Sequence, residues 1–343
     1  MKKPEVKCIV WDLDDTLWEG ILLEVEDVKL NTELKEIIHT LDSRGILHSI
    51  ASKNDYDTAL TKLRDFGLEK YFLYPEINWN AKSESISNIQ KNLNIAMESI
   101  MFIDDNPFER DEVRHTHPEV ECIDAVKLNH LLKHPRLNPR FITKDSQSRR
   151  LMYLQDMERK KNEVEYQGPK AEFLALLNMR FSIGNALEED LKRAEELTIR
   201  THQLNTTGKT YDYEDLKNFV NSKKHKLLIS DLKDKYGSHG KIGLALIEIS
   251  KNFWHLKLFL MSCRVMSYGV GTAFLSYIMH EAKKEGKRLR VDFKPTDRNR
   301  MMYVTFKFAN FKEIMADESG QMLLENELSS IQNIPPYIEL IIQ

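Results

Sequence analysis

The chain has 343 residues, and its 53 acidic and 50 basic side chains nearly cancel, leaving a formal net charge of −3. This balance gives no overall attraction to nucleic acid or to an anionic membrane. No apolar run approaches the roughly 20 residues of a membrane-spanning helix, and the first residues lack a stretch typical of a signal peptide. We therefore expect a cytoplasmic protein that binds neither nucleic acid nor membrane and is long enough for two domains.

The first predicted element is an apolar strand that ends at Trp11 and is followed directly by Asp12, Asp14 and Thr16. Ligands of open α/β sheets bind at the carboxyl ends of such strands. Asp12 and Asp14 leave the strand on the same side, so one Mg²⁺ could contact both while one of them attacks a phosphorus atom. The alternative is a helix cap after a core strand, with solvated carboxylates.

Helix and strand patterns then alternate through the first third of the chain. The predicted helices cover residues 31–44, 56–66 and 83–93, and the predicted strands cover 46–51, 72–74, 99–103 and 121–123. Pro107 suits the first turn of a further helix. Because these strands are too far apart for hairpins, the pattern favours an α/β fold with a doubly wound parallel sheet.

Polar side chains stand at the ends of these strands or on the loops just after them: Asp12 with Asp14, then Ser52, Lys82, and the pair Asp104 and Asp105. Their order and chemistry resemble the four motifs of the haloacid dehalogenase superfamily. The resemblance implies that Asp12 is the nucleophile that forms an aspartyl-phosphate and that Asp14 is the acid/base. It also implies that Ser52 donates a hydrogen bond to the phosphoryl group and that Lys82 neutralises charge around it.

The same resemblance implies a magnesium site. Its ligands would be Asp12, the backbone carbonyl of Asp14, and Asp104 helped by Asp105. Taken alone, each of these residues also has a purely structural interpretation, as a helix cap, a solvated side chain or part of a turn. The set in this order argues for the catalytic interpretation.

Neither usual insertion site of the superfamily has room for a cap domain. One helix fits between the first and second motifs, and one helix with one strand fits between the second and third. A missing cap leaves the site open, which suits a large substrate or one presented by a partner protein or a second domain. Thr16, Lys53 and Asn54 lie beside the motifs and are candidates for substrate contacts.

The second half begins a new unit after a charged helix predicted over residues 148–166. A strand is expected at 180–183, a helix at 188–200, three strands at 227–231, 242–250 and 255–261, and a helix that ends near Ala282. The third strand leads into a turn that contains Arg264, Gly269 and Gly271. A strand, a glycine-containing turn and a helix N-terminus together make an anion site. This turn resembles the pyrophosphate loop of GNAT acyltransferases, with Ser267 in place of the first glycine, and implies binding of a pantetheine arm.

Four segments together are similar to the FkbH-like family, over nearly the whole chain: Trp-Asp-Leu-Asp-Asp-Thr-Leu-Trp (11–18), Ile-Asp-Asp-Asn-Pro-Phe-Glu-Arg (103–110), Arg-Thr-His-Gln-Leu-Asn (200–205) and Ser-Cys-Arg-Val-Met (262–266). The resemblance implies an enzyme that takes 1,3-bisphosphoglycerate, removes phosphate and loads the glyceryl group as a thioester onto an acyl carrier protein for polyketide biosynthesis. His202 and Asn205 are then candidates for pantetheine or substrate contacts. Asp15, His202 and residues 236–240 depart from the family pattern, which bears most on the substrate of the second domain.

Cys263 is the candidate residue for carrying the acyl group. It follows a strand, precedes a helix N-terminus and stands beside Arg264, a setting that favours the thiolate. A buried, unreactive thiol is the alternative, because the residues before Cys263 are core-like. His202 or His239 could act as its base, or the carrier thiol could attack the acyl phosphate directly. The sequence does not order the dephosphorylation and the acyl transfer.

We expect four segments: a haloacid dehalogenase-like phosphoryl-transfer domain (1–125), a linker with connecting helices (126–178), a GNAT-like acyl- and pantetheine-binding domain (179–318) and a C-terminal tail (319–343). Two other functions stay open. One is a stand-alone, Mg²⁺-dependent, capless phosphatase that acts on a phosphoprotein or a small phosphate ester. The other is a carrier-binding scaffold without turnover, against which the intact acidic motifs argue.

Overall fold

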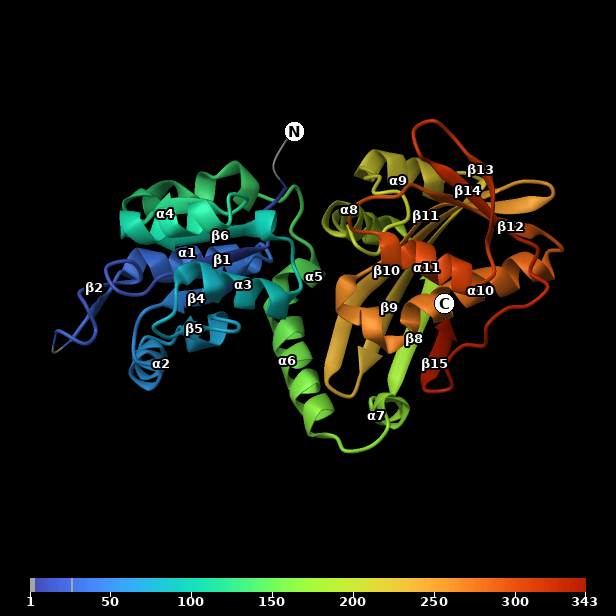
Figure 1. Cartoon of the computed structure of the whole chain (residues 1–343). Coiled ribbons are helices and arrows are strands. Elements are labelled where there is room, and N and C mark those ends of the chain that lie inside the picture. The colour runs from blue at the N-terminus through green and yellow to red at the C-terminus, as the bar shows by residue number, and fades with distance from the viewer. Residues whose placement is uncertain (1–3, 26) are drawn as a thin grey trace. The chain divides into compact units, whose positions relative to one another are not determined.

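The computed structural model describes residues 4–25 and 27–343 and divides the chain into two compact units, Met1–Met157 and Glu158–Gln343 (Figure 1). The first unit extends beyond residue 125, the predicted end of the first domain. The reason is that the segment after residue 125 packs onto the core of the first unit, through Leu128, Leu131 and Leu137. Among the described residues, no helix combines the length and the apolar character needed to cross a membrane.

The first unit is built on a five-stranded parallel sheet with the order β5-β4-β1-β6-β7. The strands are β1 (Cys8–Trp11), β4 (Leu47–Ser52), β5 (Glu76–Ile77), β6 (Ile100–Asp104) and β7 (Glu121–Asp124), and the helices between them are α1 (Thr32–Ser43), α2 (Tyr56–Asp65), α3 (Lys82–Leu93) and α4 (Pro107–Thr116). Helices α1 and α2 share a core with one face of β1, and α3 and α4 share a core with the other face. The predicted doubly wound α/β fold is confirmed.

Two local features differ from the predicted pattern. The strand expected at 72–74 is limited to a single bridge between Phe72 and His48, and the edge strand is β5. Tyr74 has a positive φ of 50°, which breaks the extended chain at that point. Between β1 and α1 the chain also forms a short hairpin of β2 (Trp18–Glu19) and β3 (Lys29–Leu30), which the sequence pattern did not indicate.

Short helices connect the first sheet to the second unit. They are η3 (Ala125–Lys133), η4 (Pro135–Leu137) and α5 (Lys144–Gln147), followed by the long helix α6 (Arg149–Glu165); two further short helices, η1 (Glu69–Tyr71) and η2 (Met97–Ser99), precede β5 and β6 within the first unit. The division between the two units falls inside α6. The charged helix predicted over 148–166 therefore belongs to both units.

The second unit is built on an eight-stranded sheet with the order β13-β14-β12-β11-β10-β9-β8-β15. The strands are β8 (Met179–Asn185), β9 (His225–Asp234), β10 (Gly237–Ile249), β11 (Phe253–Met261), β12 (Arg288–Phe293), β13 (Lys312–Ala316), β14 (Met322–Asn326) and β15 (Ile338–Ile342). The pairs β11–β12 and β8–β15 are parallel, and the others are antiparallel. This mixed sheet makes the second unit an α/β domain, in agreement with the predicted class.

Helices cover both faces of the second sheet. They are α7 (Lys170–Leu176), η5 (Glu188–Asp190), α8 (Leu191–Arg200), α9 (Tyr213–Val220), η6 (Cys263–Tyr268), α10 (Val270–Lys284) and α11 (Arg300–Phe308). Helices α7, α10 and α11 bury their apolar side chains in one core, and α8 and α9 bury theirs in a smaller core. Residues 319–343, expected as a tail, instead supply β14 and β15, because the side chains of Leu324 and Ile338 are buried in the larger core.

Candidate active site

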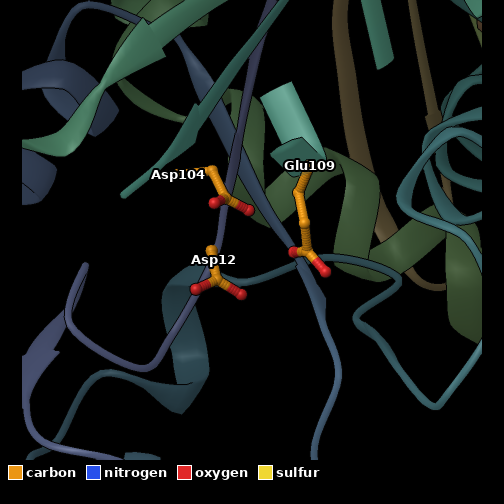
Figure 2. A group of neighbouring side chains, drawn as sticks. All are labelled: Asp12, Asp104 and Glu109. Carbon is orange, nitrogen blue, oxygen red and sulfur yellow. The ribbon is translucent and has the colours of Figure 1, made fainter. Parts of the chain in front are cut away.

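Three carboxylates meet at the carboxyl end of the first sheet. Asp12 and Asp104 are buried and Glu109 is half-buried, and each offers an oxygen within 4.8 Å of the others (Figure 2). Asp12 follows β1 and Asp104 ends β6, and these neighbouring parallel strands pair Trp11 with Ile103. The strand register therefore brings the first and last polar clusters of the sequence side by side.

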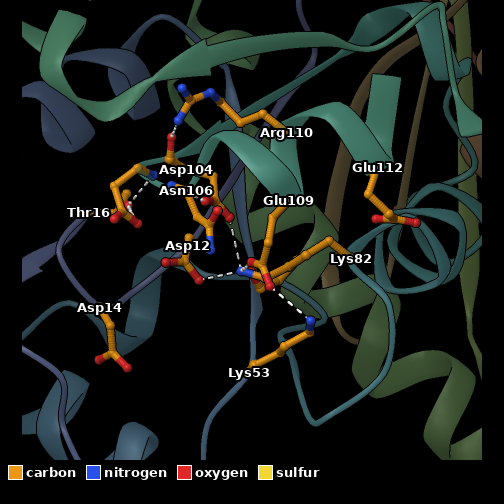
Figure 3. A network of polar contacts seen from close by, with 12 residues as sticks. Asp12, Asp14, Thr16, Lys53, Lys82, Asp104, Asn106, Glu109, Arg110 and Glu112 are labelled. Atoms are coloured by element: carbon orange, nitrogen blue, oxygen red, sulfur yellow. Dashed lines mark hydrogen bonds and ion pairs between the residues drawn. The ribbon is translucent and has the colours of Figure 1, made fainter. Parts of the chain in front are cut away.

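Lys82, the first residue of α3, lies among these carboxylates (Figure 3). Its side chain is 2% exposed, and its ammonium group donates hydrogen bonds to Asp12, to Asp104 Oδ2 at 3.1 Å and to the backbone oxygen of Ala51 at 2.8 Å. Glu109 Oε2 lies 3.0 Å from the same nitrogen. Although burial opposes the charged form, the three carboxylates raise the pKa of Lys82 above its ordinary value.

The three carboxylates together, when ionised, carry more negative charge than the single ammonium of Lys82 balances. Burial raises the pKa of Asp12, and it raises the pKa of Asp104 to about 7, with Lys82 acting in the opposite direction on both. Clustered carboxylate oxygens that are costly to ionise without a further cation are what a hard divalent cation such as Mg²⁺ binds. Asp12, Asp104 and Glu109 therefore fit a magnesium site.

Asp14 is held apart from this group by its own hydrogen bonds. Its Oδ1 accepts from the indole nitrogen of Trp18 at 2.8 Å and from the backbone N–H of Leu22 at 3.1 Å, and its Oδ2 accepts from Asn54 at 3.0 Å. Figure 3 shows its carboxylate turned away from Asp12. The side chain is thus tied to the β2–β3 hairpin on one side and to the loop after β4 on the other.

Glu109 stands where the sequence pointed to Asp105. The Asp105 side chain is exposed and pairs with Thr16, whose hydroxyl donates to Asp105 Oδ1 at 3.4 Å and accepts from the Asp105 backbone N–H at 3.1 Å. Glu109 lies in the first turn of α4, five residues after Asp104. The turn that begins with Asn106 and Pro107 brings it back over the strand end. In the sequence, the only sign of a role for Glu109 was its position in the first helical turn after the Asp104 motif.

The last residue of β4 and the two residues after it send three successive side chains to three different carboxylates. Ser52 is buried, and its hydroxyl forms a hydrogen bond to Asp12 that favours the ionised carboxylate. Lys53 forms an ion pair with Glu109 Oε1 at 2.9 Å, and Asn54 donates to Asp14. The structure thus brings Ser52 and Asn54 into the site, while Lys53 stays 41% exposed at its edge.

In the second unit, β11 and β12 pair only as far as Leu256 and then diverge. Residues 204–206 fill the gap that opens between them. Their backbone is bonded to β11 through the oxygen of Phe259 at 3.1 Å and the nitrogen of Met261 at 2.9 Å, and to Lys294 beyond β12 at 2.9 Å. These two backbone groups of β11 are therefore already paired within the protein and are not open to a pantetheine arm.

Asn205, a candidate for substrate contact, serves this inserted segment. Its side chain is fully buried, and its Oδ1 accepts from the backbone N–H groups of Thr207 at 3.1 Å and Gly208 at 3.0 Å. Asn299 secures the same segment by donating to the backbone oxygens of Asn205 at 3.0 Å and Lys294 at 2.9 Å. The amide of Asn205 is therefore engaged with the protein's own backbone.

A pocket with a volume of about 100 Å³ lies between η6, α10 and α11. Gly269 and Gly271 line it, whereas the described lining includes neither Cys263 nor Arg264. Four methionines supply much of its wall: Met261, Met266, Met301 and Met302. With the hydroxyls of Thr272 and Thr305 as its only polar side chains within the described lining, the pocket suits an apolar group.

The turn with Cys263 is braced by a buried polar network. Arg264 donates to the backbone oxygen of His239 at 2.8 Å, and the His239 ring contacts Asp234 at 3.1 Å. Asp234 also pairs with Arg159 of α6, within the second unit. His239, considered as a base for Cys263, is 1% exposed and engaged with Asp234. His202 and Cys263 are both half-buried, and the Cys263 thiol is not in a disulfide.

No protein-family model matches the sequence, and no curated protein matches it. Among solved structures, the N-terminal part of BF1531 from Bacteroides fragilis, which contains a phosphatase domain complexed with Mg, is 30% identical over 39% of this chain, with a TM-score of 0.33. This chain covers only 40% of that one.

Two further solved structures are each similar to part of the chain. The ribosomal-protein-S18-alanine N-acetyltransferase of Escherichia coli is 14% identical over 44% of this chain and 96% of its own, with a TM-score of 0.35. The GNAT domain of S. lividans PAT is 15% identical over 42% of this chain and 88% of its own, with a TM-score of 0.34. The α/β architecture of both units follows from their own strand orders, given above.

Proposed function

We propose that the first unit is a Mg²⁺-dependent phosphoryl-transfer enzyme that works through an aspartyl-phosphate on Asp12. The observation that carries the proposal is the buried ammonium of Lys82, held between Asp12, Asp104 and Glu109 at the carboxyl end of a parallel sheet. A carboxylate fixed beside a buried cation is a suitable nucleophile for phosphorus, since the cation offsets the charge that gathers during transfer. The Mg complex of the BF1531 phosphatase domain agrees with the same chemistry.

In the proposed reaction, an oxygen of Asp12 attacks the phosphorus atom and the bond to the leaving oxygen breaks. Asp14 gives a proton to the leaving oxygen. The Asp14 side chain reaches that oxygen only after its carboxylate breaks the hydrogen bonds from Trp18 and Asn54. Ser52 and Lys82 hold the transferring group by hydrogen bond and charge. Asp14 then takes a proton from water, which attacks the phosphorus and frees Asp12. Bound Mg²⁺, held by Asp12, Asp104 and Glu109, would supply further positive charge beside the phosphoryl oxygens.

The second unit completes the proposed activity by acyl transfer. On the similarity to the FkbH-like family, the substrate is 1,3-bisphosphoglycerate, and the glyceryl group is loaded as a thioester onto an acyl carrier protein for polyketide biosynthesis. The pocket at the start of α10, lined by Gly269 and Gly271, supports a site for the phosphopantetheine arm. Either Cys263 or the carrier thiol attacks the acyl phosphate, displacing phosphate from the carbonyl carbon.

A stand-alone phosphatase is the second candidate, acting on a phosphoprotein or a small phosphate ester. The described lining of the pocket favours the phosphatase in one respect. It is mostly apolar and offers only the side chains of Thr272 and Thr305 as hydrogen-bond partners for the hydroxyls of a glyceryl group. Cys263 also lies outside that lining. The second unit would then serve only for docking.

The test is intact-mass spectrometry after incubation with Mg²⁺, 1,3-bisphosphoglycerate and a phosphopantetheinylated carrier protein. A glyceryl adduct on the carrier supports acyl transfer, and phosphate release without any acyl adduct supports the second candidate. The Asp12→Asn variant is expected to lose at least about 10³-fold in phosphate release. If Asp12→Asn released phosphate at the wild-type rate, the aspartyl-phosphate proposal would be wrong. Carrier loading at the wild-type rate by Cys263→Ala would exclude a covalent role for that thiol.

A further inference from the structure

Helix α3 begins at the residue that carries the site's ammonium group. Lys82 is its first residue, and the preceding Ala81 has no side-chain oxygen with which to cap the helix. The first N–H groups of a helix need acceptors from outside the helix, and an uncapped first turn frays. The backbone of Lys82 therefore depends on another element for its placement.

Glu112 of α4 supplies the missing cap. Its Oε2 accepts a hydrogen bond from the backbone N–H of Ser83 at 3.1 Å, and its Oε1 accepts from the Ser83 hydroxyl. A carboxylate at this position also interacts favourably with the positive end of the helix dipole. His117, at the end of α4, contacts the backbone oxygen of the same serine at 3.0 Å. One helix thus fixes the first turn of the other.

Glu109 and Glu112 lie three residues apart on α4, so they share a face of that helix. Glu109 contacts the ammonium of Lys82, and Glu112 holds the backbone of the next residue, so α4 fixes both ends of the lysine side chain (Figure 3). Lysine has four rotatable side-chain bonds, and its ammonium is well placed only if its backbone is. The separation of the two glutamates by one turn gives α4 this double role.

We infer that Glu112 is a positioning residue for phosphoryl transfer, acting through Lys82. The inference rests on the proposed function of the first unit. Glu112 touches neither Asp12 nor Asp104 in any contact recorded among the described residues, so its effect on the reaction passes through the start of α3. Misplacement of a catalytic group by about 1 Å can lower a rate by up to about 10²-fold. Loss of the cap should therefore lower turnover more than substrate affinity.

The test compares Glu112→Ala and Glu112→Gln with the control Asp111→Ala. Asp111 is the exposed neighbour of Glu112 on α4, and the ion pair recorded for it is with Arg114. Phosphate release from p-nitrophenyl phosphate with Mg²⁺ gives kcat and KM. Competitive labelling with an amine reagent, read by peptide mass spectrometry, gives the reactivity of Lys82 independently of turnover.

We expect Glu112→Ala to lower kcat by about 10- to 100-fold, to change KM by less than about 3-fold and to raise the labelling of Lys82. Glu112→Gln keeps an oxygen that can accept from the Ser83 N–H, so its kcat should stay within about 3-fold of wild type. Asp111→Ala should match wild type in both measurements. If Glu112→Ala does not fold, Ser83→Ala, which removes one of the two cap bonds, should show a smaller change of the same kind.

Wild-type kcat and wild-type Lys82 labelling in Glu112→Ala would overturn the inference. A lower kcat with unchanged labelling would overturn it too, because the effect would then not pass through Lys82. If the wild-type protein released no phosphate from any phosphate ester, the proposed function would fail. The labelling of Lys82 would still decide whether Glu112 positions it.

Discussion

Glu109 connects two lysines that reach the site from different elements, Lys82 from the start of α3 and Lys53 from the loop after β4. Its Oε2 contacts Lys82, and its Oε1 pairs with Lys53, which comes from the loop after β4. Although burial opposes ionisation, these two lysines hold the pKa of Glu109 below its ordinary value. In the proposed magnesium site, Glu109 would therefore offer an ionised carboxylate even where Asp104 is costly to ionise.

The metal site can be tested residue by residue. We expect Asp104→Asn and Glu109→Gln each to weaken Mn²⁺ or Mg²⁺ binding by about 10- to 100-fold, because each removes a carboxylate from the group. Asp105→Asn should change binding by less than about 3-fold, since Asp105 pairs with Thr16 outside that group. Titration followed by electron paramagnetic resonance of Mn²⁺ measures the affinity. An equally large loss in Asp105→Asn would mean that the aspartate ligates the metal.

The site residues at strand ends, and Lys82 at the start of α3, were accessible to sequence reasoning, whereas Glu109 in the first turn of α4 was not. Asp12, Ser52 and Asp104 come together because each ends or follows a strand of one parallel sheet, and the carboxyl ends of such strands meet at one edge. Glu109 depends instead on the direction in which α4 leaves its turn. The sequence suggested Asn205 only as a binding residue. It could not show that the Asn205 amide bonds the protein's own backbone, because the path of this segment between two diverging strands leaves no local sequence pattern.

Among the elements of the second unit, the segment 204–206 takes the place of a short strand, because its backbone bonds to β11 on one side and to Lys294 on the other. It separates β11 from β12, and Asn299 ties it to the turn after β12 through three backbone oxygens, those of Asn205, Thr206 and Lys294. A single buried amide thus connects segments that lie far apart in the chain. The two diverging strands and their inserted segment form one structural unit.

Asn299→Ala tests this unit. The variant leaves buried carbonyl oxygens without their donor, and we expect a loss of about 1–3 kcal/mol in the free energy of unfolding of the second unit. Amide hydrogen exchange should increase at Thr206 and Met261, whose N–H groups bond across the segment. Asn252→Ala, at an exposed turn, is the matched control. Unchanged exchange at both amides would show that the segment holds its place without Asn299.

The pair of Arg159 and Asp234 gives a prediction with a defined pH dependence. Although burial opposes ionisation, hydrogen bonds from His239 and Arg159 hold the pKa of Asp234 below its ordinary value. The stability that this ionisation contributes is complete above the unfolded-state pKa of about 3.9 and is lost as the pH falls below it. The contribution is therefore constant at neutral pH and disappears in acid.

We expect Asp234→Asn to cost about 3 kcal/mol of unfolding free energy at pH 7, because it removes a buried carboxylate that pairs with the buried Arg159. The difference from wild type should shrink at pH 3. Thermal unfolding at both pH values measures it. Glu188→Gln, which removes an exposed ion pair with Lys217, should cost less than about 1 kcal/mol. A pH-independent difference for Asp234→Asn would contradict the assigned ionisation.

At the scale of the whole molecule, the sequence reveals an α/β protein of two units but not how the second unit ends. The alternation of strands and helices in the first unit is regular enough to show the parallel sheet. In the second, β15 pairs in parallel with β8 across most of the unit's length. Such a pairing is invisible in a local pattern, so residues 319–343 looked like a tail.

Removal of residues 335–343 should therefore disturb the second sheet, because it removes the edge strand β15. Without β15, the backbone groups of β8 along Met179–Ile183 lose their partners, and an unpaired edge strand invites pairing with other chains. We expect the shortened protein to form soluble oligomers or aggregates, as size-exclusion chromatography with light scattering would detect. Glu339→Gln, which removes only an exposed ion pair with Arg180, should remain like wild type. A shortened protein of wild-type size and stability would contradict this role.

The pairing of β8 with β15 also has a consequence for synthesis on the ribosome. The first sheet is complete once residue 124 has emerged, whereas β8 waits for β15, which is translated after all the other strands of the second sheet. At about 5–20 residues per second, the 158 residues that follow β8 take about 8–30 s to add. During that interval the nascent second unit carries an unpaired strand edge that is open to pairing with other chains, whereas the first sheet already has all of its strands.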